Sequence, residues 1–371
     1  MKVLVAMSGG VDSSVAAKLL CDEGNVCIGC TMKLYSNEDA GISKSHTCCS
    51  LDDVEDARSV AERLGMEYFV FNFSDDFHKK VIDKFIDSYL AGITPNPCID
   101  CNRYMKFDKL FSRAEVLGCD KIATGHYARI DFKDGKYRLL RAVDTTKDQS
   151  YVLYSMNQYQ LEHTVFPLGG LCKDEVRAIA AQGGFVNAEK PDSQDICFVP
   201  DGDYARIIEL HTGKMAEPGD FVDRDGRVLG RHNGIIRYTP GQRKGLGISF
   251  EGRKYVLRVT PEDNTVTLGD EPELYSRYAC ISDVNIISGE EVTAPFDCGI
   301  KIRYRQPDKP THIVPYRGLL IAFFREPQRA VTPGQAAVMY DGDVVLGGGT
   351  IVRDTPELRE FAEKYMAEHD I

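Results

Sequence analysis

The sequence predicts an α/β fold with a doubly wound parallel sheet, followed by a small β-rich connector and a C-terminal antiparallel β-barrel. Two observations predict the sheet: short apolar runs alternate with amphipathic helical segments, and a serine–glycine loop joins the first run to the first helix. A third observation predicts the connector and the barrel: after about residue 205, short β-prone runs are separated by Gly, Pro, Asp and Asn turns. We expect domains at residues 1–205, 206–277 and 278–371.

The composition is that of a soluble globular protein. The chain has 371 residues, 43% of them hydrophobic and 27% charged, and a formal net charge of −11. This charge argues against indiscriminate nucleic-acid binding but is compatible with a local basic face. No apolar run reaches membrane-spanning length, and the N-terminal apolar segment is too short for a signal peptide. We therefore expect a cytoplasmic protein with no membrane partner.

The first domain is predicted to alternate strands and helices. The expected strands are residues 3–7, 26–34, 68–73 and 121–124, and the expected helices are 11–20, 54–64, 77–89 and 173–183. Residues 36–49 are polar and predict a mobile loop, Ser50 with Asp53 predicts a helix start, and Asp134-Gly135 predicts a hairpin turn. In a sheet of this kind ligands bind at the carboxyl ends of the strands, where Met32 would lie beside a nucleotide.

The remainder is predicted to be mainly β structure. Expected short strands are residues 221–222, 234–238, 255–259 and 265–268, and expected longer ones are 280–287, 298–304, 318–324 and 336–346, the last with a turn at Asp341-Gly342. Residues 358–368 predict a closing helix. This pattern is typical of a small β-rich connector and a terminal barrel or sandwich.

The loop that follows the first apolar run reads Ser8-Gly9-Gly10-Val11-Asp12-Ser13-Ser14. A strand–glycine loop–helix arrangement presents backbone N–H groups and the positive end of a helix dipole to an anion. Gly9 and Gly10 let the backbone approach phosphate closely. The serines add hydroxyl donors, and Asp12, which we take as a catalytic residue, places a carboxylate where Mg²⁺ could bridge to phosphate oxygens.

This loop is not a Walker A motif, because no Gly-Lys-Ser/Thr follows its glycines. It resembles instead the pyrophosphate-binding loop of the N-type ATP pyrophosphatases, with the pattern Ser-Gly-Gly-x-Asp-Ser. Members of that superfamily grip the β- and γ-phosphates of ATP and leave the α-phosphorus open to an attacking oxygen, giving an adenylate and pyrophosphate. The alternative is a solvated serine–glycine turn after a buried strand. We expect the loop to bind ATP.

Two of the twelve cysteines stand out in Thr94-Pro95-Asn96-Pro97-Cys98-Ile99-Asp100-Cys101-Asn102. Pro97 suits the first position of a helix, which would put Cys98 and Cys101 one turn apart on one face. A helix N-terminus lowers the pKa of a thiol, so both could be thiolates, although a structural pair is the alternative. Cys27 and Cys30 fall on a predicted strand and are expected in the core. Cys48 and Cys49 remain ambiguous.

Here the chain resembles the tRNA-specific 2-thiouridylase family, which converts the wobble uridine of certain tRNAs to 2-thiouridine. The matching residues span all three predicted domains: Ser8 to Ser14, Thr94-Pro95-Asn96-Pro97 with Cys101-Asn102, Ala123-Thr124-Gly125-His126-Tyr127, Lys147-Asp148-Gln149-Ser150-Tyr151, Asp192-Ser193-Gln194 with Ile196-Cys197-Phe198, Thr239-Pro240-Gly241-Gln242-Arg243, Arg303-Tyr304-Arg305 and Thr332-Pro333-Gly334-Gln335. So many ordered matches are highly specific.

The resemblance implies roles for individual residues. ATP would be held by Ala6, Met7, Ser8, Gly9, Gly10, Val11, Asp12, Ser13, Met32 and Gly125. Cys101 and Cys197 would be the catalytic pair, with Cys197 carrying the sulfur as a persulfide. Asn96, Pro97 and the residue at 98 would lie against the target base. Contacts with tRNA would come from His126, Lys147, Asp148, Gln149, Arg303, Tyr304 and Gln335. The implied partners are tRNAs for Glu, Gln and Lys and a sulfur donor, such as a cysteine desulfurase or a sulfur-relay protein.

One position departs from the family pattern, because many members carry aspartate where this chain has Cys98. Three thiolates, from Cys98, Cys101 and Cys197, can hold a [4Fe–4S] cluster with one open iron. A subset of the family with this three-cysteine pattern resembles cluster-dependent enzymes, whose open iron binds the sulfide to be transferred. We expect the cluster in preference to the persulfide, with zinc as a weaker third option.

Residues 301–329 are basic and carry interleaved aromatic residues, which is typical of a surface that tracks phosphates and stacks bases. Arg237, Arg243 and Lys244 could extend it. A solvated sheet face is the alternative. Our functional prediction is an ATP-dependent tRNA sulfurtransferase. Two alternatives remain: another adenylating enzyme, such as a GMP, NAD or argininosuccinate synthetase type, or a non-catalytic RNA-binding protein that senses ATP or iron.

Overall fold

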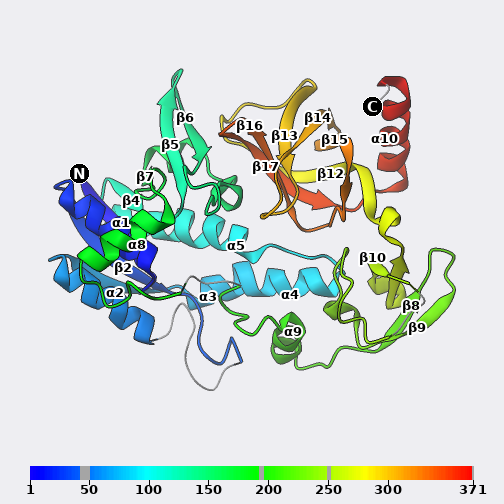
Figure 1. Ribbon diagram of the computed structural model, residues 1–371, viewed down its shortest axis with the longest axis horizontal. Coiled ribbons are helices and arrows are strands. Elements are labelled where there is room, and N and C mark those ends of the chain that lie inside the picture. Colours follow the sequence, from blue (N-terminus) through cyan, green and yellow to red (C-terminus); the bar gives the residue numbers. More distant parts are fainter. Residues whose placement is uncertain (42–50, 192–195, 249–251, 370–371) are drawn as a thin grey trace.

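The computed structural model describes residues 1–41, 51–191, 196–248 and 252–369. Its first part contains a five-stranded parallel sheet in the order β3-β2-β1-β4-β7, which confirms the doubly wound prediction (Figure 1). The strands are β1 (Lys2–Ala6), β2 (Val26–Lys33), β3 (Glu67–Asn72), β4 (Lys121–Ala123) and β7 (Thr164–Val165). Because β1 pairs with β2 on one side and β4 on the other, the loop after β1 lies where the strand order reverses.

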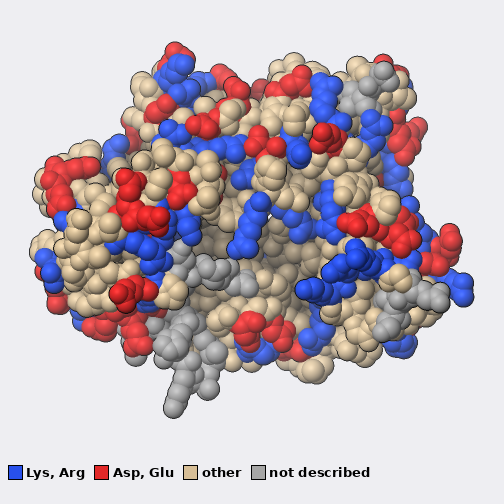
Figure 2. Space-filling view, in the orientation of Figure 1, with Lys and Arg blue, Asp and Glu red and all other residues tan. Residues whose placement is uncertain are grey.

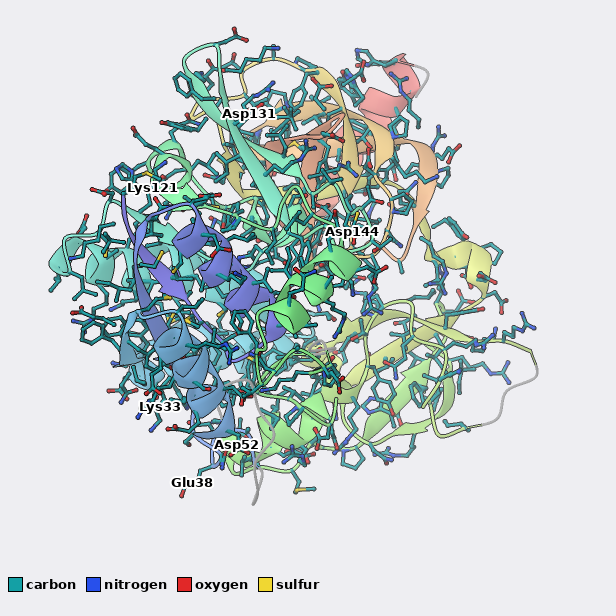
Figure 3. All side chains as sticks on the ribbon, turned by 60° about the vertical axis from the view of Figure 1, so that its left-hand side comes forward. Lys33, Glu38, Asp52, Lys121, Asp131 and Asp144 are labelled. Carbon is teal, nitrogen blue, oxygen red and sulfur yellow. The ribbon has the colours of Figure 1, made fainter. Side chains whose placement is uncertain are left out.

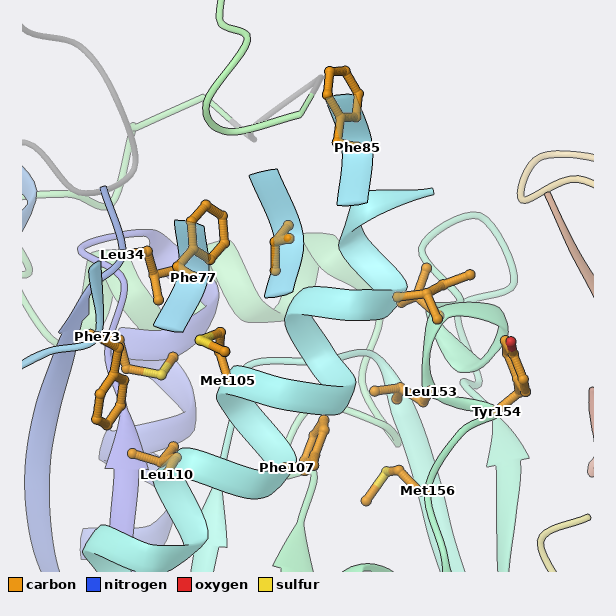
Figure 4. Close-up of a cluster of buried hydrophobic side chains, with 14 of the residues drawn as sticks. Leu34, Phe73, Phe77, Phe85, Met105, Phe107, Leu110, Leu153, Tyr154 and Met156 are labelled. Carbon is orange, nitrogen blue, oxygen red and sulfur yellow. The ribbon is translucent and has the colours of Figure 1, made fainter. Parts of the chain in front are cut away.

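Helices cover both faces of this sheet. On one face α1 (Val11–Asp22), α2 (Leu51–Arg63) and α8 (Lys173–Gln182) pack against Val3 and Val5. Leu4 faces the opposite core, since neighbouring residues of a strand point to opposite sides. That core is covered by two helical runs: α3 (Ser74–Phe77), η1 (His78–Ile82) and α4 (Asp83–Leu90), then α5 (Pro97–Asp100), η2 (Cys101–Lys109) and α6 (Leu110–Val116). Figure 4 shows Met105 directed toward Phe73 and Phe77 in this core.

The hairpin of β5 (Ala128–Lys133) and β6 (Lys136–Arg141) confirms the predicted Asp134-Gly135 turn. Both turn residues have positive φ, 53° and 80°, as the tight hairpin turn requires. The sequence did not predict which sheet the hairpin joins. β6 pairs with β17 (Val344–Val352) of the C-terminal barrel, so the first domain adds two strands to the barrel's sheet (Figure 1). This pairing fixes the barrel against the first domain.

The connector begins with α9 (Tyr204–Thr212) and contains a four-stranded sheet in the order β10-β11-β8-β9. Its strands are β8 (Gly219–Val222), β9 (Val228–His232), β10 (Tyr255–Thr260) and β11 (Thr265–Gly269). The predicted strand at 234–238 is wrong, because η4 (Ile235–Arg237) is a short 3₁₀ turn. The backbone N–H of Gly234 donates to His232 Nδ1 over 3.0 Å, which turns the chain out of the extended direction.

The C-terminal part is a six-stranded antiparallel barrel, as predicted, closed by the pairing of β12 with β17. Its strands are β12 (Tyr275–Ile286), β13 (Phe296–Lys301), β14 (Lys309–Tyr316), β15 (Leu319–Arg329), β16 (Ala336–Asp341) and β17. The prediction omitted β14, because Pro310 and Pro315 disguise its alternating pattern. The predicted closing helix is α10 (Pro356–His369), whose Leu358, Phe361 and Tyr365 pack on the outside of the barrel.

Four short elements complete the fold: η3 (Ser150–Leu153), α7 (Gln158–Glu162), η5 (Pro261–Asp263) and η6 (Glu271–Leu274). Cys27 and Cys30 are both buried, which confirms their assignment to the core. Residues 42–50, with Cys48, Cys49 and the Ser50 helix start, lie outside the described residues, as does the Asp192-Ser193-Gln194 motif. No helix in the part of the chain that the structure describes is long and apolar enough to cross a membrane.

Candidate active site

The loop between β1 and α1 is ordered by its own hydroxyl groups. Ser13 Oγ donates to the carbonyl oxygen of Gly10 over 3.0 Å and accepts the backbone N–H of Ser8 over 3.1 Å. Ser14 Oγ also donates to the Gly10 carbonyl, over 3.1 Å. These bonds hold the loop open at the N-terminus of α1, where backbone N–H groups and the helix dipole attract an anion.

Two glycines permit close approach around this loop. Gly9 has φ +75°, and a Cβ built on it would lie 2.4 Å from the carbonyl oxygen of Asp53. A Cβ on Gly125, which follows β4, would lie 2.8 Å from the backbone nitrogen of Ser13. A larger residue at either position would displace the loop. Both glycines were predicted to hold ATP, and the structure explains why each position needs the smallest residue.

The other residues predicted to hold ATP gather at the same edge of the sheet. Ala6 pairs with Cys30 and Val5 pairs with Ala123, so the carboxyl ends of β1, β2 and β4 are adjacent. Met32 lies near the end of β2 and is 9% exposed. The hydroxyl of Thr31 donates to the carbonyl oxygen of Met7 over 2.6 Å, which joins β2 to the start of the loop.

Asp12 is held by two donors from other elements. Its Oδ1 accepts a hydrogen bond from Lys173 Nζ over 2.7 Å and one from the Tyr127 hydroxyl over 2.8 Å. Lys173 is the first residue of α8 and is only 7% exposed. Tyr127 follows β4 and exchanges backbone and side-chain hydrogen bonds with Gln149. The carboxylate therefore connects the nucleotide loop to α8 and to the segment 147–149.

The segment after α8 also returns to the loop. Asn187 Nδ2 donates to the Gly9 carbonyl and to Ser14 Oγ, both over 2.9 Å. Lys190 Nζ donates to Asp56 over 2.8 Å and also pairs with Asp53. Although burial opposes it, the hydrogen bonds that Lys190 donates to these two carboxylates raise its pKa. Asn187 and Lys190 therefore bind the loop from the segment after α8.

The segment 94–98 is framed by turns from the other two parts of the chain. Gln335 Nε2 donates to the carbonyl oxygens of Thr94 and Pro95 over 2.9 and 3.3 Å, and Thr94 N donates to the Pro333 carbonyl over 3.0 Å. The Thr94 hydroxyl donates to the hydroxyl of Thr239, in the connector, over 3.2 Å. The two Thr-Pro-Gly-Gln turns thus hold the segment that the resemblance places against the target base.

Arg303 joins these two turns to each other. Its Nη2 donates to the carbonyl oxygens of Pro240 and Ala330 over 3.1 and 3.3 Å, and to the Thr332 hydroxyl over 2.5 Å. Burial lowers the pKa of its guanidinium. The Arg303 side chain therefore connects the barrel to the connector through hydrogen bonds. Its contact with tRNA stays a prediction.

Pro97 starts helix α5, as predicted, but the two cysteines that follow have different surroundings. Cys98 is exposed. Burial, then the charge of Asp148 and then that of Cys98 raise the pKa of Tyr304 to about 12. Cys98 and Tyr304 are therefore neighbours. Cys101 is half-buried and packs against the first hydrophobic core. Cys98 and Cys101 were predicted to share one face of the helix, but Cys98 lies at the surface and Cys101 lies against the core.

At Cys101 the helix changes from α to π geometry, and the run to Lys109 contains a kink at Phe107, where φ is −108° and ψ is 18°. A π-helix has more residues per turn than an α-helix, so residues five apart approach the same face. Burial raises the pKa of the Cys101 thiol, and the Lys106 ammonium opposes that rise. Lys106 Nζ lies 3.3 Å from His126 Nε2, and Thr124 Oγ1 lies 2.7 Å from His126 Nδ1. Lys106 thus stands between the thiol and a buried imidazole.

His126 is neutral in this arrangement. It is 6% exposed, and burial followed by the nearby Lys106 charge lowers its pKa well below the usual value. Because an ammonium can only donate, Nε2 accepts from Lys106, and Nδ1 carries the proton toward Thr124. The ring lies between Phe107 and Phe166. The predicted tRNA contact of His126 would require a substrate group to enter this buried position.

Cys197 is placed by an aromatic cluster at the end of β2. The Tyr35 hydroxyl donates to the carbonyl oxygen of Cys197 over 2.6 Å. The next residue, Phe198, is fully buried and makes edge contacts with Tyr35, Phe77 and Phe85. Cys197 is half-buried and packs, like Cys101, against the first core.

The remaining residues predicted to bind tRNA differ in exposure. Asp148 is buried and accepts hydrogen bonds from Ala142 N, Ser150 N and the Ser150 hydroxyl, so it orders its own loop. Lys147, Gln149 and Asn96 are half-buried, and Tyr304 and Arg305 are exposed. Figure 2 shows Lys and Arg side chains around a hollow near the centre of this face, between the first domain and the connector.

The basic stretch 301–329 is less positive than its sequence suggests. Arg325 pairs with Asp297 over 3.3 Å, Lys309 with Glu326 over 3.3 Å and Arg329 with Glu271 over 3.7 Å. Arg317 pairs with Glu357. Glu326 lies within the stretch, but Asp297, Glu271 and Glu357 come from β13, η6 and α10, and the sequence could not show that the fold brings them to these cations.

Three family models match the chain in order. They are "tRNA methyl transferase HUP domain" over residues 1–201, "tRNA methyl transferase PRC-barrel domain" over 207–270 and "Aminomethyltransferase beta-barrel domain" over 276–351. The chain is 50% identical over 354 residues to the tRNA-specific 2-thiouridylase MnmA of Acetivibrio thermocellus, an alignment that covers 94% of this chain and 99% of that protein. This chain belongs to the tRNA-specific 2-thiouridylase family.

A second 2-thiouridylase, from Clostridioides difficile, is 49% identical over 354 residues, covering 94% of this chain and 98% of that protein. The resemblance drawn from the sequence motifs is thereby confirmed along nearly the whole chain. Since these relatives match all three parts of the chain in one alignment, the chain is an enzyme of the 2-thiouridylase type, with the ATP-using loop, connector and barrel of that family.

The structure of this 2-thiouridylase does not support the predicted iron–sulfur cluster. Among the described residues, no group of three His, Cys, Asp or Glu side chains is placed to hold a metal ion. A cluster needs three sulfur atoms directed at one point. Here Cys98 is exposed beside the barrel, whereas Cys101 and Cys197 pack against the core. The described residues likewise give no support for zinc bound by these three cysteines.

Sequence reasoning missed three side chains that contact the nucleotide loop of this 2-thiouridylase: Lys173, Asn187 and Lys190. The sequence carried a signal for one of them, Lys173. A lysine in the first turn of a helix is disfavoured by the helix dipole, so Lys173 at the start of α8 calls for a nearby negative partner. Asn187 and Lys190 lie in an irregular segment, and no local pattern indicated that it folds back on residue 9.

Proposed function

We propose that this enzyme converts the wobble uridine of tRNA, at position 34, to 2-thiouridine, using ATP and releasing AMP and pyrophosphate. The observation that carries the proposal is that turns from the connector and the barrel both bind the start of segment 94–98, at Thr94 and Pro95. The helix that this segment opens leads through Cys101 and Lys106 to His126, directly after Gly125 of the nucleotide site. A base held at this segment would face both an ATP loop and a thiol.

The loop supplies what ATP requires. The Ser-Gly-Gly turn and the N-terminus of α1 would receive the β- and γ-phosphates, with Met32 and Gly125 beside the nucleoside. Asp12 can offer one carboxylate oxygen to Mg²⁺. Since no three-ligand group exists among the described residues, the ion would take its other oxygens from phosphates and water, as Mg²⁺ commonly does.

The chemistry follows from the poor reactivity of uracil. Its C2 carbonyl has no leaving group, so sulfur cannot displace the oxygen directly. Attack of that oxygen on the α-phosphorus of ATP breaks the bond to the pyrophosphate and makes AMP the leaving group. A wobble base is unpaired, so it can be turned into the pocket at low energetic cost.

The sulfur would travel on Cys197 as a persulfide. Its terminal sulfur attacks C2 and expels AMP, and the Cys101 thiolate then attacks the Cys197 sulfur. That second step breaks the S–S bond, leaving 2-thiouridine on the tRNA and a Cys101–Cys197 disulfide that an external dithiol must reduce. Cys101 and Cys197 both pack against the first core, whereas Cys98 is exposed, and this difference supports the relay.

The tRNA would be held by the exposed Tyr304 and Arg305 near Cys98, by Lys147 and by the connector. The connector has an open hollow of about 470 Å³ lined by Arg243, Arg253 and Lys254 among glycines, which suits a phosphate backbone. We propose Glu, Gln and Lys tRNAs as substrates and a cysteine desulfurase or sulfur-relay protein as the donor, with Asn96 and Pro97 against the base.

The test measures pyrophosphate release after tRNA is added to enzyme and ATP. We expect release with a transcript carrying uridine at position 34 and background release with the same transcript carrying cytidine there. Cys101→Ser and Cys197→Ser should abolish 2-thiouridine formation, and the matched variant Cys98→Ser should retain it. Absence of tRNA-dependent release would indicate an ATP-sensing RNA-binding protein and would overturn the proposal.

A further inference from the structure

A tyrosine hydroxyl holds the backbone of Cys197 at its carbonyl group. Tyr35 lies two residues beyond the end of β2, between Lys33 and Glu38, both of which are labelled in Figure 3. Its hydroxyl donates to the carbonyl oxygen of Cys197 over 2.6 Å, and Tyr35 is only 3% exposed. The two residues are 162 positions apart in the sequence, so only the fold brings them together.

The ring of Tyr35 is held in place by aromatic neighbours. It contacts the rings of Phe77 and Phe198, with centroid separations of 5.8 and 6.4 Å. Both of these phenylalanines are fully buried in the first core. Because a packed ring has little freedom to move, the hydroxyl that it carries is a fixed point against which the backbone of Cys197 is placed.

The segment that follows Tyr35 is also fastened, in this case to helix α9. Arg206 Nη1 donates to the carbonyl oxygen of Gly41 over 2.9 Å, and His211 Nε2 donates to that of Asp39 over 2.8 Å. Helix α9 begins shortly after the turn that contains the sulfur-carrying cysteine. The end of β2 and the cysteine's own segment are therefore held together at two places.

Cys197 occupies the first central position of a β-turn. The Val199 N–H donates to the Ile196 carbonyl oxygen over 2.9 Å, which closes the turn. The peptide between the two central residues is the one that rotates when a turn changes type, and its carbonyl oxygen is that of Cys197. Phe198 opposes this rotation, because the alternative type requires positive φ there, and Phe198 is not among the described residues with positive φ. Tyr35 opposes it directly, by binding the carbonyl oxygen.

Phe198 already anchors this segment to the core without the hydrogen bond. Its ring is 1% exposed and makes edge contacts with Phe77 and Phe85. The Tyr35 hydroxyl acts instead on one atom of the residue that carries the sulfur. A carbonyl group held in this way restricts ψ of Cys197, and with it the direction in which the side chain leaves the backbone.

We propose that Tyr35 is a positioning residue for sulfur transfer, whose hydroxyl fixes the peptide after Cys197 and thereby directs the sulfur of this residue toward the activated uridine. The inference rests on the proposed function, since it concerns the cysteine that carries the persulfide there. Cys197 has to be aligned twice, first with C2 of the base and then with Cys101. Both steps depend on the orientation of the reacting atoms.

Loss of this alignment exposes the activated base to water. When the persulfide attacks C2 slowly, a water oxygen bonds to C2 instead, AMP leaves with the electron pair of the broken C–O bond, and the proton goes to solvent. Uridine is regenerated, and one ATP is consumed without formation of 2-thiouridine. Pyrophosphate is released in either case, so the amount of 2-thiouridine per pyrophosphate reports the alignment separately from adenylation.

The test uses Tyr35→Phe, which removes the hydroxyl and keeps the ring. Enzyme loaded with persulfide is mixed with ATP, Mg²⁺ and tRNA, and 2-thiouridine and pyrophosphate are measured over time. We expect 2-thiouridine formation to slow about threefold to tenfold, as the loss of one hydrogen bond predicts, while pyrophosphate release stays within about twofold of the wild type. The amount of 2-thiouridine per pyrophosphate should therefore fall at early times. Retained pyrophosphate release also shows that the variant is folded.

Tyr278→Phe is the matched control. The Tyr278 hydroxyl donates to Asp354 Oδ2 over 2.7 Å, and its ring packs under helix α10 on the outside of the barrel. This variant loses a comparable hydrogen bond and should keep the wild-type product ratio. An unchanged product ratio in Tyr35→Phe, or an equal fall in thiolation and pyrophosphate release, would overturn the inference. A wild-type enzyme that releases no pyrophosphate with tRNA would overturn the proposed function instead, which is a separate outcome.

Discussion

At the scale of single residues, the site is a set of side chains whose chemistry depends on their charged neighbours. Asp12 faces Lys173, Lys190 faces Asp53 and Asp56, and Lys106 lies between Cys101 and His126. The sequence singled out Asp12, Cys101 and Cys197 as candidates, because they stand in dense local motifs. It did not single out Lys173 or Lys190, because the fold brings each of them to its partner from a distant segment.

Replacing Lys106 should make Cys101 less reactive. Burial raises the pKa of this thiol and the Lys106 ammonium opposes the rise, so Lys106→Met should raise the pKa further. Because alkylating agents react with the thiolate, the midpoint of the pH–rate profile for iodoacetamide at Cys101 should move to higher pH and the rate at neutral pH should fall. Mass spectrometry of the Cys101 peptide measures that rate.

Lys109→Met is the matched control, because Lys109 lies in the same helix and pairs with Asp76 over 2.8 Å at the surface. An unchanged profile for Cys101 in Lys106→Met would mean that the ammonium does not act on the thiol.

At the scale of elements, short irregular features position the site. The loop after β1, the π-helical turn at Cys101 and the two Thr-Pro-Gly-Gln turns hold the predicted site residues, whereas the regular strands and helices support them. The sequence predicted most of these regular elements within a few residues, because the 2.0 and 3.6 periodicities are strong there. It did not predict the π-helical segment, in which Met105 and Phe107 pack into the first core.

Gly9→Ala should disable the nucleotide loop. Its φ of +75° and the 2.4 Å separation between a built Cβ and the Asp53 carbonyl oxygen combine backbone strain with a backbone collision. We expect loss of ATP binding, measured by calorimetry. Gly24→Ala is the control, because Gly24 has φ +79° but nothing within 4 Å of its Cβ position, so only the strain of roughly 1 kcal/mol remains. Equal ATP binding by both variants would contradict the close-approach argument.

At the scale of the whole molecule, three contacts join the three parts of the chain. β6 extends the barrel sheet, Arg303 connects the connector with the barrel, and Gln335 connects the barrel with segment 94–98. The order and type of the parts could be predicted, because turn frequency and strand length change along the sequence. Their contacts could not, since strand pairing between Leu140 and Val344 and the salt bridges that neutralise Arg325 and Lys309 join residues distant in sequence.

Arg303→Ala should weaken the joint rather than a surface contact. It leaves the Pro240 and Ala330 carbonyl oxygens without the guanidinium, at a cost of about 1–3 kcal/mol. We expect a lower Tm and reduced tRNA thiolation with ATP binding unchanged. The exposed neighbour Arg305 provides the comparison: Arg305→Ala should keep the wild-type Tm and weaken tRNA binding in a salt-dependent way. A wild-type Tm for Arg303→Ala would contradict the claim that Arg303 stabilises the contact between the barrel and the connector.

The central claim is that two thiols, Cys101 and Cys197, transfer sulfur to an ATP-activated wobble uridine without an iron–sulfur cluster. The most direct measurement is a single turnover. Enzyme loaded with persulfide is mixed with ATP, Mg²⁺, excess iron chelator and tRNA, and the amounts of 2-thiouridine, AMP and pyrophosphate are compared. The account predicts equal amounts of the three products, unchanged in Cys98→Ser. Thiolation that appears only after iron and sulfide are restored, and that is lost in Cys98→Ser, would contradict it.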